Sequence, residues 1–210
     1  MMAPDWAALD AAWTSARRAG VLGSATTEEI VAHAAGYLPA ACRVQDSFSA
    51  IDLGTGAGVP GVVLAALRPN SHWVLLDGNA RRCEHAQSAV RSLSLNDRVD
   101  VVHARVEEIA HDSMHRGSYD LVVARSFGPP EDLAECALPL LTANGTLAVS
   151  VTAETLDRWE LAVEVLPELE LEVEGTAASE DGRHALIRMG GTCPPAWPRR
   201  PATRRRTPLF

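Results

Sequence analysis

The segment spanning residues 52–61 combines a carboxylate with closely spaced glycines, and this combination suits a bound nucleoside. It reads Asp-Leu-Gly-Thr-Gly-Ala-Gly-Val-Pro-Gly. Glycine lets the backbone turn sharply and approach a ligand closely. A short apolar strand pattern at 48–53 precedes the turn and a helical pattern at 60–67 follows it, which is the context that such a motif requires. The turn is therefore the first candidate site.

Two classes of nucleoside ligand compete for this turn. Residues 56–61 fit the dinucleotide fingerprint G-x-G-x-x-G, in which helix N-terminal amides face a pyrophosphate. Asp52 stands directly before the glycines and favours S-adenosylmethionine (SAM) instead, because a carboxylate attracts an ammonium group and repels a diphosphate. We expect SAM, held by Asp52, Gly56 and Gly58. A dinucleotide site and a purely structural turn are the alternatives.

Further candidate residues follow the next three predicted strands. Asp77 ends the second, where an acid can accept hydrogen bonds from both ribose hydroxyls; its alternative role is to cap the helix that begins near Asn79. Val106 and Glu107 follow the third strand, where the adenine edge would lie. Arg125 follows the fourth, at the edge of the sheet where open α/β folds bind ligands, although on spacing alone it could equally be a surface arginine.

The sequence contains no convincing metal site or catalytic triad. The seven histidines form no ligand set, and we expect His111 and His115, four positions apart, to lie in a loop or at a helix end. The four cysteines include no C-x-x-C pair and are expected to be buried or inert thiols. Methyl transfer from SAM needs none of these groups, because the sulfonium methyl is already activated and catalysis is mostly positioning.

The elements that must position these residues alternate between strand and helix from residue 48 onward. Such alternation predicts an α/β fold with a parallel, doubly wound sheet. A loop without a helix joins the last two strands, so they should be antiparallel neighbours. We therefore predict a seven-stranded, mostly parallel sheet with one antiparallel strand. The predicted strands are 48–53, 73–76, 99–103, 119–124, 146–151, 169–173 and 184–189, and helices are predicted at 60–67, 83–93, 131–141 and 156–166.

The chain divides into three predicted parts. Residues 1–47 form an N-terminal helical extension, in which Trp6, Leu9 and Trp13 share a helical face and Thr26 to Glu29 resembles a capping box. Residues 48–190 form the SAM-binding domain. Residues 191–210 are rich in Pro and Arg, contain no periodic pattern, and are predicted to be an extended basic tail.

Charge is unevenly distributed along the chain. The net charge is -8, yet residues 188–210 contain six arginines and no acid. An acidic body makes a poor general nucleic-acid binder, whereas the tail could contact phosphate or simply be solvated. No apolar run approaches the roughly 20 residues that span a bilayer, and the start lacks the features of a signal peptide. We expect a cytoplasmic protein without a membrane segment.

Several motifs in one order resemble the RsmG (GidB) family, which methylates N7 of a guanine in small-subunit ribosomal RNA. The resemblance runs from about residue 28 to residue 210, and its most specific part is the segment 52–61 with its closing Pro-Gly. The other matching motifs are Arg68-Pro69, Leu75-Leu76-Asp77, Arg105-Val106-Glu107-Glu108, Ala124-Arg125-Ser126, Arg183-His184 and the segment 195–201.

The resemblance implies a class I SAM-dependent methyltransferase fold (Rossmann-like) with SAM as cofactor and no metal. The implied partner is small-subunit rRNA or the 30S subunit, with Arg125 in the catalytic region and, together with arginines 199–206, contacting phosphate. Guanine N7 carries no proton, so the lack of a general base fits this chemistry. The implied SAM contacts are Gly54, Val59, Val106, Glu107 and Arg125, with Asp77 at the ribose.

Three departures from the family pattern fall outside the glycine turn, on elements that could face RNA. The N-terminus is shorter and lacks the Trp-Asn and Asn-Leu-Thr elements. The family's Asp-Ser pair is replaced by Gly36-Tyr37, and Val151 stands near the position of an expected lysine. Two alternatives therefore stand beside rRNA methylation: a paralogue that methylates a small molecule or another RNA, and a non-catalytic SAM-binding protein.

Overall fold

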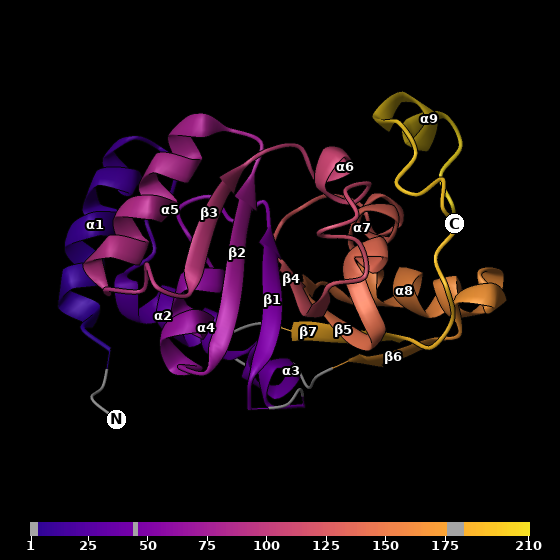
Figure 1. The fold of residues 1–210 in the computed structure, drawn as a ribbon, viewed down its shortest axis with the longest axis horizontal. Helices are drawn as coiled ribbons and strands as arrows, with labels where there is room; N and C mark the ends of the chain where they lie inside the picture. Colours follow the sequence, from indigo (N-terminus) through magenta and orange to yellow (C-terminus); the bar gives the residue numbers. More distant parts are fainter. Residues whose placement is uncertain (1–3, 44–45, 176–182) are drawn as a thin grey trace.

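The protein is built around one seven-stranded sheet (Figure 1). The computed structural model describes residues 4–43, 46–175 and 183–210. The strand order is β3-β2-β1-β4-β5-β7-β6, in which β7 is antiparallel to both neighbours and the other paired strands are parallel. The predicted sheet with one reversed strand is confirmed. The strands are β1 (Phe48–Leu53), β2 (Ser71–Asp77), β3 (Val99–His103), β4 (Tyr119–Ala124), β5 (Leu141–Val151), β6 (Leu171–Gly175) and β7 (Arg183–Met189).

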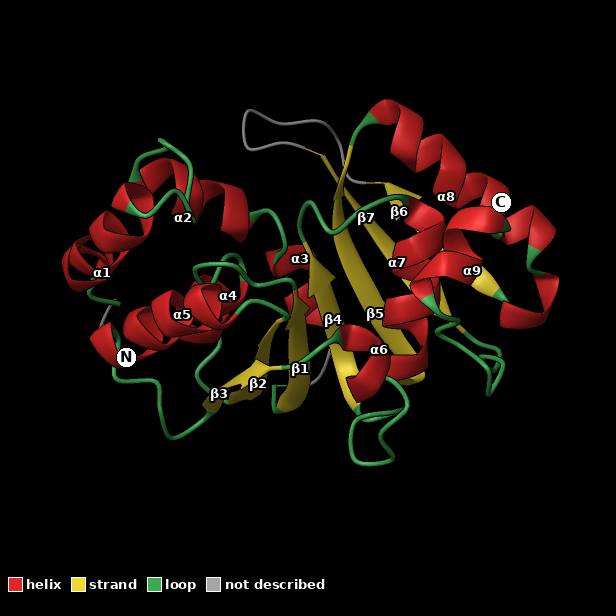
Figure 2. Ribbon diagram, turned by 90° about the horizontal axis from the view of Figure 1, so that it is seen from above, coloured by secondary structure: helices red, strands yellow, loops and turns green. Residues whose placement is uncertain are grey.

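Helices cover both faces of the sheet (Figure 2), and the buried apolar residues form a separate core under each set. Alternate residues of one strand serve different cores: Ala50 packs with the first set of helices, and Ile51 packs with the second. The first set is α1 (Trp6–Arg18), α2 (Thr27–Ala35), α3 (Leu38–Arg43), α4 (Gly61–Leu67) and α5 (Ala80–Ser92). The second set is α6 (Val106–Ile109), α7 (Pro130–Ala137) and α8 (Ala153–Val165), and α9 (Pro201–Arg206) lies on the same side.

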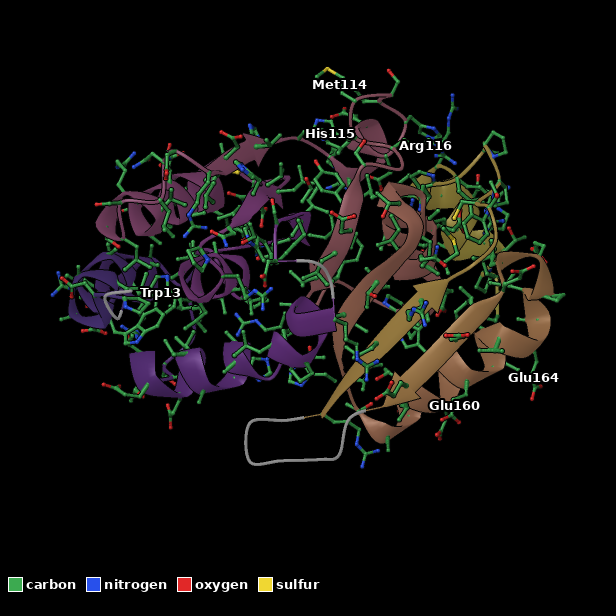
Figure 3. The ribbon with its side chains drawn as sticks, turned by 60° about the horizontal axis from the view of Figure 1, so that its bottom comes forward. Trp13, Met114, His115, Arg116, Glu160 and Glu164 are labelled. Atoms are coloured by element: carbon green, nitrogen blue, oxygen red, sulfur yellow. The ribbon has the colours of Figure 1, made fainter. Side chains whose placement is uncertain are left out.

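The N-terminal segment is helical, as predicted, and α1 reaches the glycine turn. Leu9 and Trp13 are fully buried, and the indole Nε1 of Trp13 donates a 2.9 Å hydrogen bond to the carbonyl of Ala57 (Figure 3). The capping box before α2 is present: Thr26 and Glu29 each accept a hydrogen bond from the other's backbone N–H. Local caps thus start the helix, while a long-range bond ties the segment to the candidate site.

Three predicted boundaries are wrong, and each lies next to a 3-10 turn that contains a proline. The helix predicted to run to Leu141 ends as α7 at Ala137 and tightens into a 3-10 turn, Leu138–Leu140, that contains Pro139. Proline lacks the N–H that an α-helix needs and disfavours helical geometry in the residue before it. β5 therefore begins at Leu141, five residues earlier than predicted. In the same way Leu169 belongs to the 3-10 turn Pro167–Leu169, and β6 begins at Leu171.

The C-terminal segment, 191–210, is not the extended tail that the sequence predicts. It contains α9 and packs against the body, with Cys193, Trp197 and Arg204 buried. Arg116, in the loop before β4 (Figure 3), donates hydrogen bonds to the carbonyls of Pro194 and Trp197, at 2.9 and 2.7 Å. These contacts join positions about 80 residues apart, so no local pattern in the sequence reveals them.

The described part of the chain has no helix long and apolar enough to cross a membrane. Nor do the described residues contain a group of three or more His, Cys, Asp or Glu side chains placed to hold a metal ion. His111 and His115 serve other contacts. The ring of His111 lies 3.0 Å from the carbonyl of Pro198, and that of His115 lies 2.6 Å from the hydroxyl of Tyr119.

Candidate functional site

The glycines of the turn after β1 are required for two different reasons. Gly54, Gly56 and Gly58 have φ angles of 70°, 61° and 94°, a region that side chains with a Cβ disfavour. Gly61 has no such φ, but a Cβ there would lie 2.4 Å from Leu75 Cδ2 and 2.8 Å from the carboxylate of Asp52. The first three shape the turn, and Gly61 lets α4 pack closely on the sheet.

Asp52 lies beneath the turn and orders it. Its side chain is fully buried, and Oδ2 accepts hydrogen bonds from the Thr55 hydroxyl (2.7 Å) and the Gly61 N–H (2.9 Å). Burial raises the pKa of Asp52 to about 6, and these two bonds limit the rise. Its other oxygen, Oδ1, is buried and has no hydrogen-bond partner among the described residues. That oxygen is an unused acceptor enclosed beneath the turn.

Asp77 lies at the end of β2, next to the turn. Its side chain is 5% exposed, and it accepts hydrogen bonds from the N–H groups of Gly56 (3.0 Å) and Asn79 (2.9 Å). The N-cap of α5 is Asn79, whose side chain accepts from Arg81 and Arg82, so the alternative capping role for Asp77 is wrong. A carboxylate has about four lone-pair sites, so Asp77 can still accept from a ligand.

A cleft of about 540 Å³ lies along the carboxyl edge of β1, β2, β3 and β4. Gly54, Asp77 and Val106, all predicted to bind the cofactor, line it. The structure does not bring the other predicted residues to its surface: Asp52, Gly56, Gly58, Val59, Glu107 and Arg125 lie outside the lining. The rest of the wall comes from residues 78–79, 104–105 and 126–129, together with Leu76, Arg82, Asp132, Pro201, Arg204 and Arg205.

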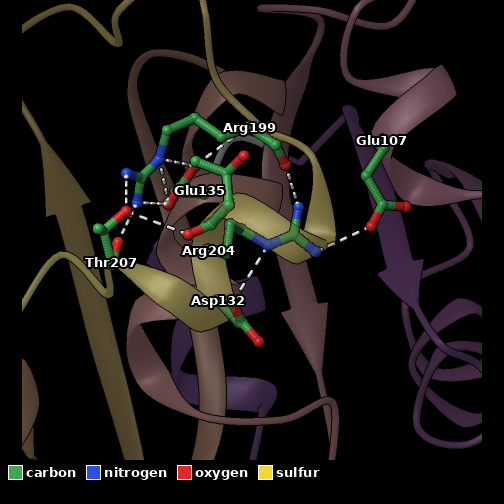
Figure 4. Close-up of polar contacts among 7 residues, drawn as sticks. Glu107, Asp132, Glu135, Arg199, Arg204 and Thr207 are labelled. Atoms are coloured by element: carbon green, nitrogen blue, oxygen red, sulfur yellow. Dashed lines mark hydrogen bonds and ion pairs between the residues drawn. The ribbon is translucent and has the colours of Figure 1, made fainter.

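Arg204 and Arg205 of the C-terminal segment line part of this cleft. Arg204, 6% exposed, donates to Oε1 of Glu107 at 2.8 Å and to Oδ1 of Asp132 at 3.1 Å (Figure 4). Arg199 pairs with the buried carboxylate of Glu135. These two arginines are therefore engaged within the chain. The sequence does not indicate Arg204 and Asp132 as site residues. The basic C-terminal segment contains no acid, and the partners of Arg204 lie 72 and 97 positions away along the chain.

Glu107 stays ionised beside this cluster. Burial alone would raise its pKa, but the hydrogen bond from Arg204, a backbone hydrogen bond and the charges of Arg105 and Arg204 outweigh burial and lower it. Glu107 therefore carries a negative charge just behind the cleft wall formed by Ala104, Arg105 and Val106. The hydrogen bond from Arg204 to Glu107 thus connects the C-terminal segment to this wall.

Arg125 and the residues after it form the loop that follows β4. Arg125 is half-buried, and its positive charge acts to lower the pKa values of Asp52 and Tyr37. Ser126 has a φ of 52°, which is uncommon for a residue other than glycine. The Phe127 ring passes over the glycine turn, with Cδ2 3.5 Å from where a Cβ on Gly54 would lie. The loop therefore brings an aromatic ring to the cleft.

A second pocket, of about 340 Å³, lies on the other side of this loop. The loop residues Ser126, Phe127 and Gly128 line both spaces. The remaining wall of the second pocket comes from Leu133 of α7, the end of β5, the start of α8, the first residue of β7, and His33 of α2. The two spaces are thus neighbours along one edge of the sheet.

A known family model covers most of the chain. The model described as rRNA small subunit methyltransferase G, GidB, matches residues 13–185.

The chain belongs to the GidB family.

Curated relatives of this GidB family member carry one name, Ribosomal RNA small subunit methyltransferase G. A Synechococcus protein is 35% identical over 168 residues, which cover 76% of this chain and 63% of that protein. A Symbiobacterium thermophilum protein is 35% identical over 181 residues, covering 81% and 73%. The chain thus spans less than two thirds of the Synechococcus relative. The family predicted from the motifs is confirmed.

Solved structures confirm the fold class of this GidB family member. An O-methyltransferase from Bacillus cereus, in complex with SAH, superposes with a TM-score of 0.64 at 15% identity, covering 87% of this chain and 90% of that one. At such identity the likeness is one of fold. The fold is that of class I SAM-dependent methyltransferases, as predicted.

This chain departs from the GidB pattern at Gly36 and Tyr37, and the structure shows how these two residues pack against their neighbours. A Cβ at Gly36 would lie 2.3 Å from Cε1 of His184, so the imidazole of His184 requires glycine there. Tyr37 is fully buried, its ring centroid is 4.3 Å from that of His184, and its hydroxyl donates to the Ala124 carbonyl at 3.0 Å. Gly36 and Tyr37 therefore pack against His184, and the Tyr37 hydroxyl supports the end of β4 at Ala124. Val151, the third departure from the family pattern, lines the second pocket.

Proposed function

We propose that this GidB family member is a SAM-dependent methyltransferase of small-subunit rRNA, with N7 of a guanine as acceptor. Family membership and the shared name of its relatives support the activity and the RNA class. The proposed substrate implies a cytoplasmic protein whose partner is rRNA or the 30S subunit. We further propose residues 48–190 as the methyltransferase domain, residues 1–47 as an extension, and residues 191–210 as a basic segment.

One observation favours SAM over a dinucleotide. In dinucleotide sites, the amides at the N-terminus of the helix after the glycine turn face the pyrophosphate. Here the first amide of α4, that of Gly61, donates instead to the buried carboxylate of Asp52. An anion at this place would meet a carboxylate rather than a free amide. The turn therefore suits a ligand with a cationic amino acid end.

Each part of SAM has a proposed contact. Asp77 lines the cleft and would accept from the ribose hydroxyls, and the buried carboxylate of Asp52 beneath the turn would favour the ammonium group. The turn residues Gly54, Gly56, Gly58 and Val59 would lie along the cofactor, and Val106, with Glu107 behind it, would support the adenine edge. When bound, SAM supplies an electrophilic sulfonium methyl.

The residues act mainly by positioning. Guanine N7 presents an unprotonated lone pair, so transfer requires in-line approach rather than a general base. We propose that Arg125 belongs to the catalytic region: its charge favours the ionised form of Asp52, and its place after β4 suits contact with an RNA phosphate. The Ser126–Gly128 loop separates the cleft from the neighbouring pocket.

Methyl incorporation tests the proposal. Purified protein is incubated with tritiated SAM and with 30S subunits or rRNA from a strain that lacks the gene. Label in the small-subunit rRNA, followed by chain cleavage specific to 7-methylguanine, is the expected result. Label on another RNA or a small molecule would favour the paralogue alternative. SAM binding in calorimetry without any transfer would favour a binding protein.

A further inference from the structure

We infer that the second pocket receives the base of an unpaired nucleotide, with Phe127 and aliphatic side chains packing on the base and Arg183 contacting the RNA backbone. This inference rests on the proposed function, because it concerns the acceptor side of the same reaction.

The position of the pocket supports this assignment. Ser126, Phe127 and Gly128 line both the cofactor cleft and the second pocket, so one short loop separates the two spaces. A methyl donor in the cleft and an acceptor in the pocket would meet at this loop. Donor and acceptor would therefore lie as neighbours along one edge of the sheet, with this loop between their binding spaces.

The two spaces differ in the charged side chains that line them. The cleft is lined by the carboxylates of Asp77 and Asp132 and by four arginines, Arg82, Arg105, Arg204 and Arg205, of which Arg204 pairs with Asp132. The second pocket is lined by no acidic residue among those described, and Arg183 lies on its wall without an ion-pair partner in the described part of the chain. An anionic RNA strand is attracted by an arginine and repelled by carboxylates. An RNA strand at the second pocket would meet Arg183 and no carboxylate of the described lining.

The lining has the character of a base pocket. Leu133, Val149 and Val151 provide apolar surface and Phe127 an aromatic ring, while the hydroxyls of Ser150 and Thr155 provide polar groups. Proteins that recognise unpaired bases combine such stacking surfaces with a few hydrogen bonds to the base edge. A volume of about 340 Å³ lies at the lower end of the range for small-molecule sites, which suits one nucleotide.

Filling the pocket is the first test. Val151→Phe places a bulky ring in the pocket, and Val163→Phe makes the same change on the exposed face of α8, outside both spaces. We expect Val151→Phe to lower kcat/KM for rRNA by about tenfold or more, within the range that a base-stacking contact contributes. The Kd for SAM, measured by calorimetry, should stay within about twofold of wild type, because SAM is proposed to bind in the separate cleft. Val163→Phe should leave both values unchanged.

RNA binding gives a second, independent test. Arg183→Gln should reduce the slope of log K against log salt for unpaired RNA by about 0.7, the value for one lost phosphate contact. The matched control is Arg188→Gln on the same strand, because Arg188 already pairs with Glu172 at 3.0 Å. We expect the control to keep the wild-type slope. Binding is measured with the full chain at several salt concentrations.

The outcomes separate the two proposals. If wild-type protein methylates rRNA while Val151→Phe and Arg183→Gln behave like their controls, the pocket assignment is overturned and the proposed function stands. If wild-type protein transfers no methyl group to any rRNA, the proposed function fails, and the salt slope of Arg183→Gln still decides whether the pocket contacts RNA. Should Val151→Phe not fold, as judged by circular dichroism, the Arg183 comparison carries the test alone.

Discussion

The most informative perturbation is Arg204→Met, because Arg204 joins the C-terminal segment to the wall of the cofactor cleft. Its guanidinium reaches Glu107 at 2.8 Å and Asp132 at 3.1 Å, and the side chain is 7% exposed. Methionine keeps much of the side-chain length and packing but removes the charge and every donor. The substitution therefore tests the ion pairs rather than the bulk of the side chain.

The expected cost follows from the burial of the partners. Removing one member of a fully buried ion pair costs about 3–5 kcal/mol, whereas an exposed pair contributes about 0–1 kcal/mol. The side chains of Glu107 and Asp132 are 16% and 26% exposed, so water solvates part of the charge that is left behind. We expect the free energy of unfolding to fall by about 2 kcal/mol. For a chain of this size the Tm should drop by about 4–8 °C.

Urea denaturation of the ligand-free protein measures this change, with Arg206→Met as control. Arg206 lies on the same helix, α9, but is exposed and outside the cleft lining. We expect the control to leave the free energy of unfolding unchanged. If the two variants are equally stable, Arg204 does not anchor the segment. Calorimetry on Arg204→Met should also show weaker SAM binding, because Glu107 loses the partner that holds it behind the cleft wall.

Three further predictions concern the glycine turn and its supports. Gly61→Ala should lower the free energy of unfolding by about 1–3 kcal/mol, since its Cβ would lie 2.4 Å from Leu75 Cδ2; Gly23→Ala, with nothing within 4 Å, is the control, and equal urea midpoints would contradict the reasoning. Asp52 has a folded-state pKa of about 6, above its ordinary value of 3.8, so its contribution to stability is present below pH 4 and is lost as the pH rises through about 6. Wild-type stability relative to Asp52→Asn should therefore fall by up to about 3 kcal/mol between pH 4 and pH 7, and a difference that does not change with pH would refute the assignment. Tyr37→Phe should cost about 1 kcal/mol in chemical denaturation, because the Ala124 carbonyl loses its buried hydroxyl donor; an unchanged midpoint would show that this hydrogen bond does not stabilise the end of β4.

Local sequence patterns are enough to predict the order of the helices and strands and the bounds of several strands. The strand boundaries of β1, β3 and β4 match the predicted ranges, and Asp77 lies at the end of β2, as expected. Such features depend on side-chain alternation and capping within a few residues, which a single sequence displays. The glycine turn is recognisable in the same way, and the position of Asp52 beside its glycines indicates the class of ligand.

The finer points of the site depend on neighbours in space. The sequence predicts that Gly61 belongs to a ligand loop, but the structure shows that Leu75 and Asp52 leave no room for a Cβ there. Gly36 and Tyr37, which depart from the family pattern, fit around His184 on a distant strand. A substitution that looks disruptive in a motif can be accommodated when its partner has changed as well, and only packing reveals the partner.

The sequence alone determined the order of the elements, the direction of the sheet strands and the acid-glycine turn, because each is specified by residues close together along the chain. Only the tertiary structure decided that the C-terminal segment folds back, since its anchoring bonds from Arg204 to Glu107 join residues 97 positions apart. Only the structure showed that a second pocket adjoins the cofactor cleft. Ion pairs and cavities arise from the positions of side chains in space, and local periodicity carries no information about them.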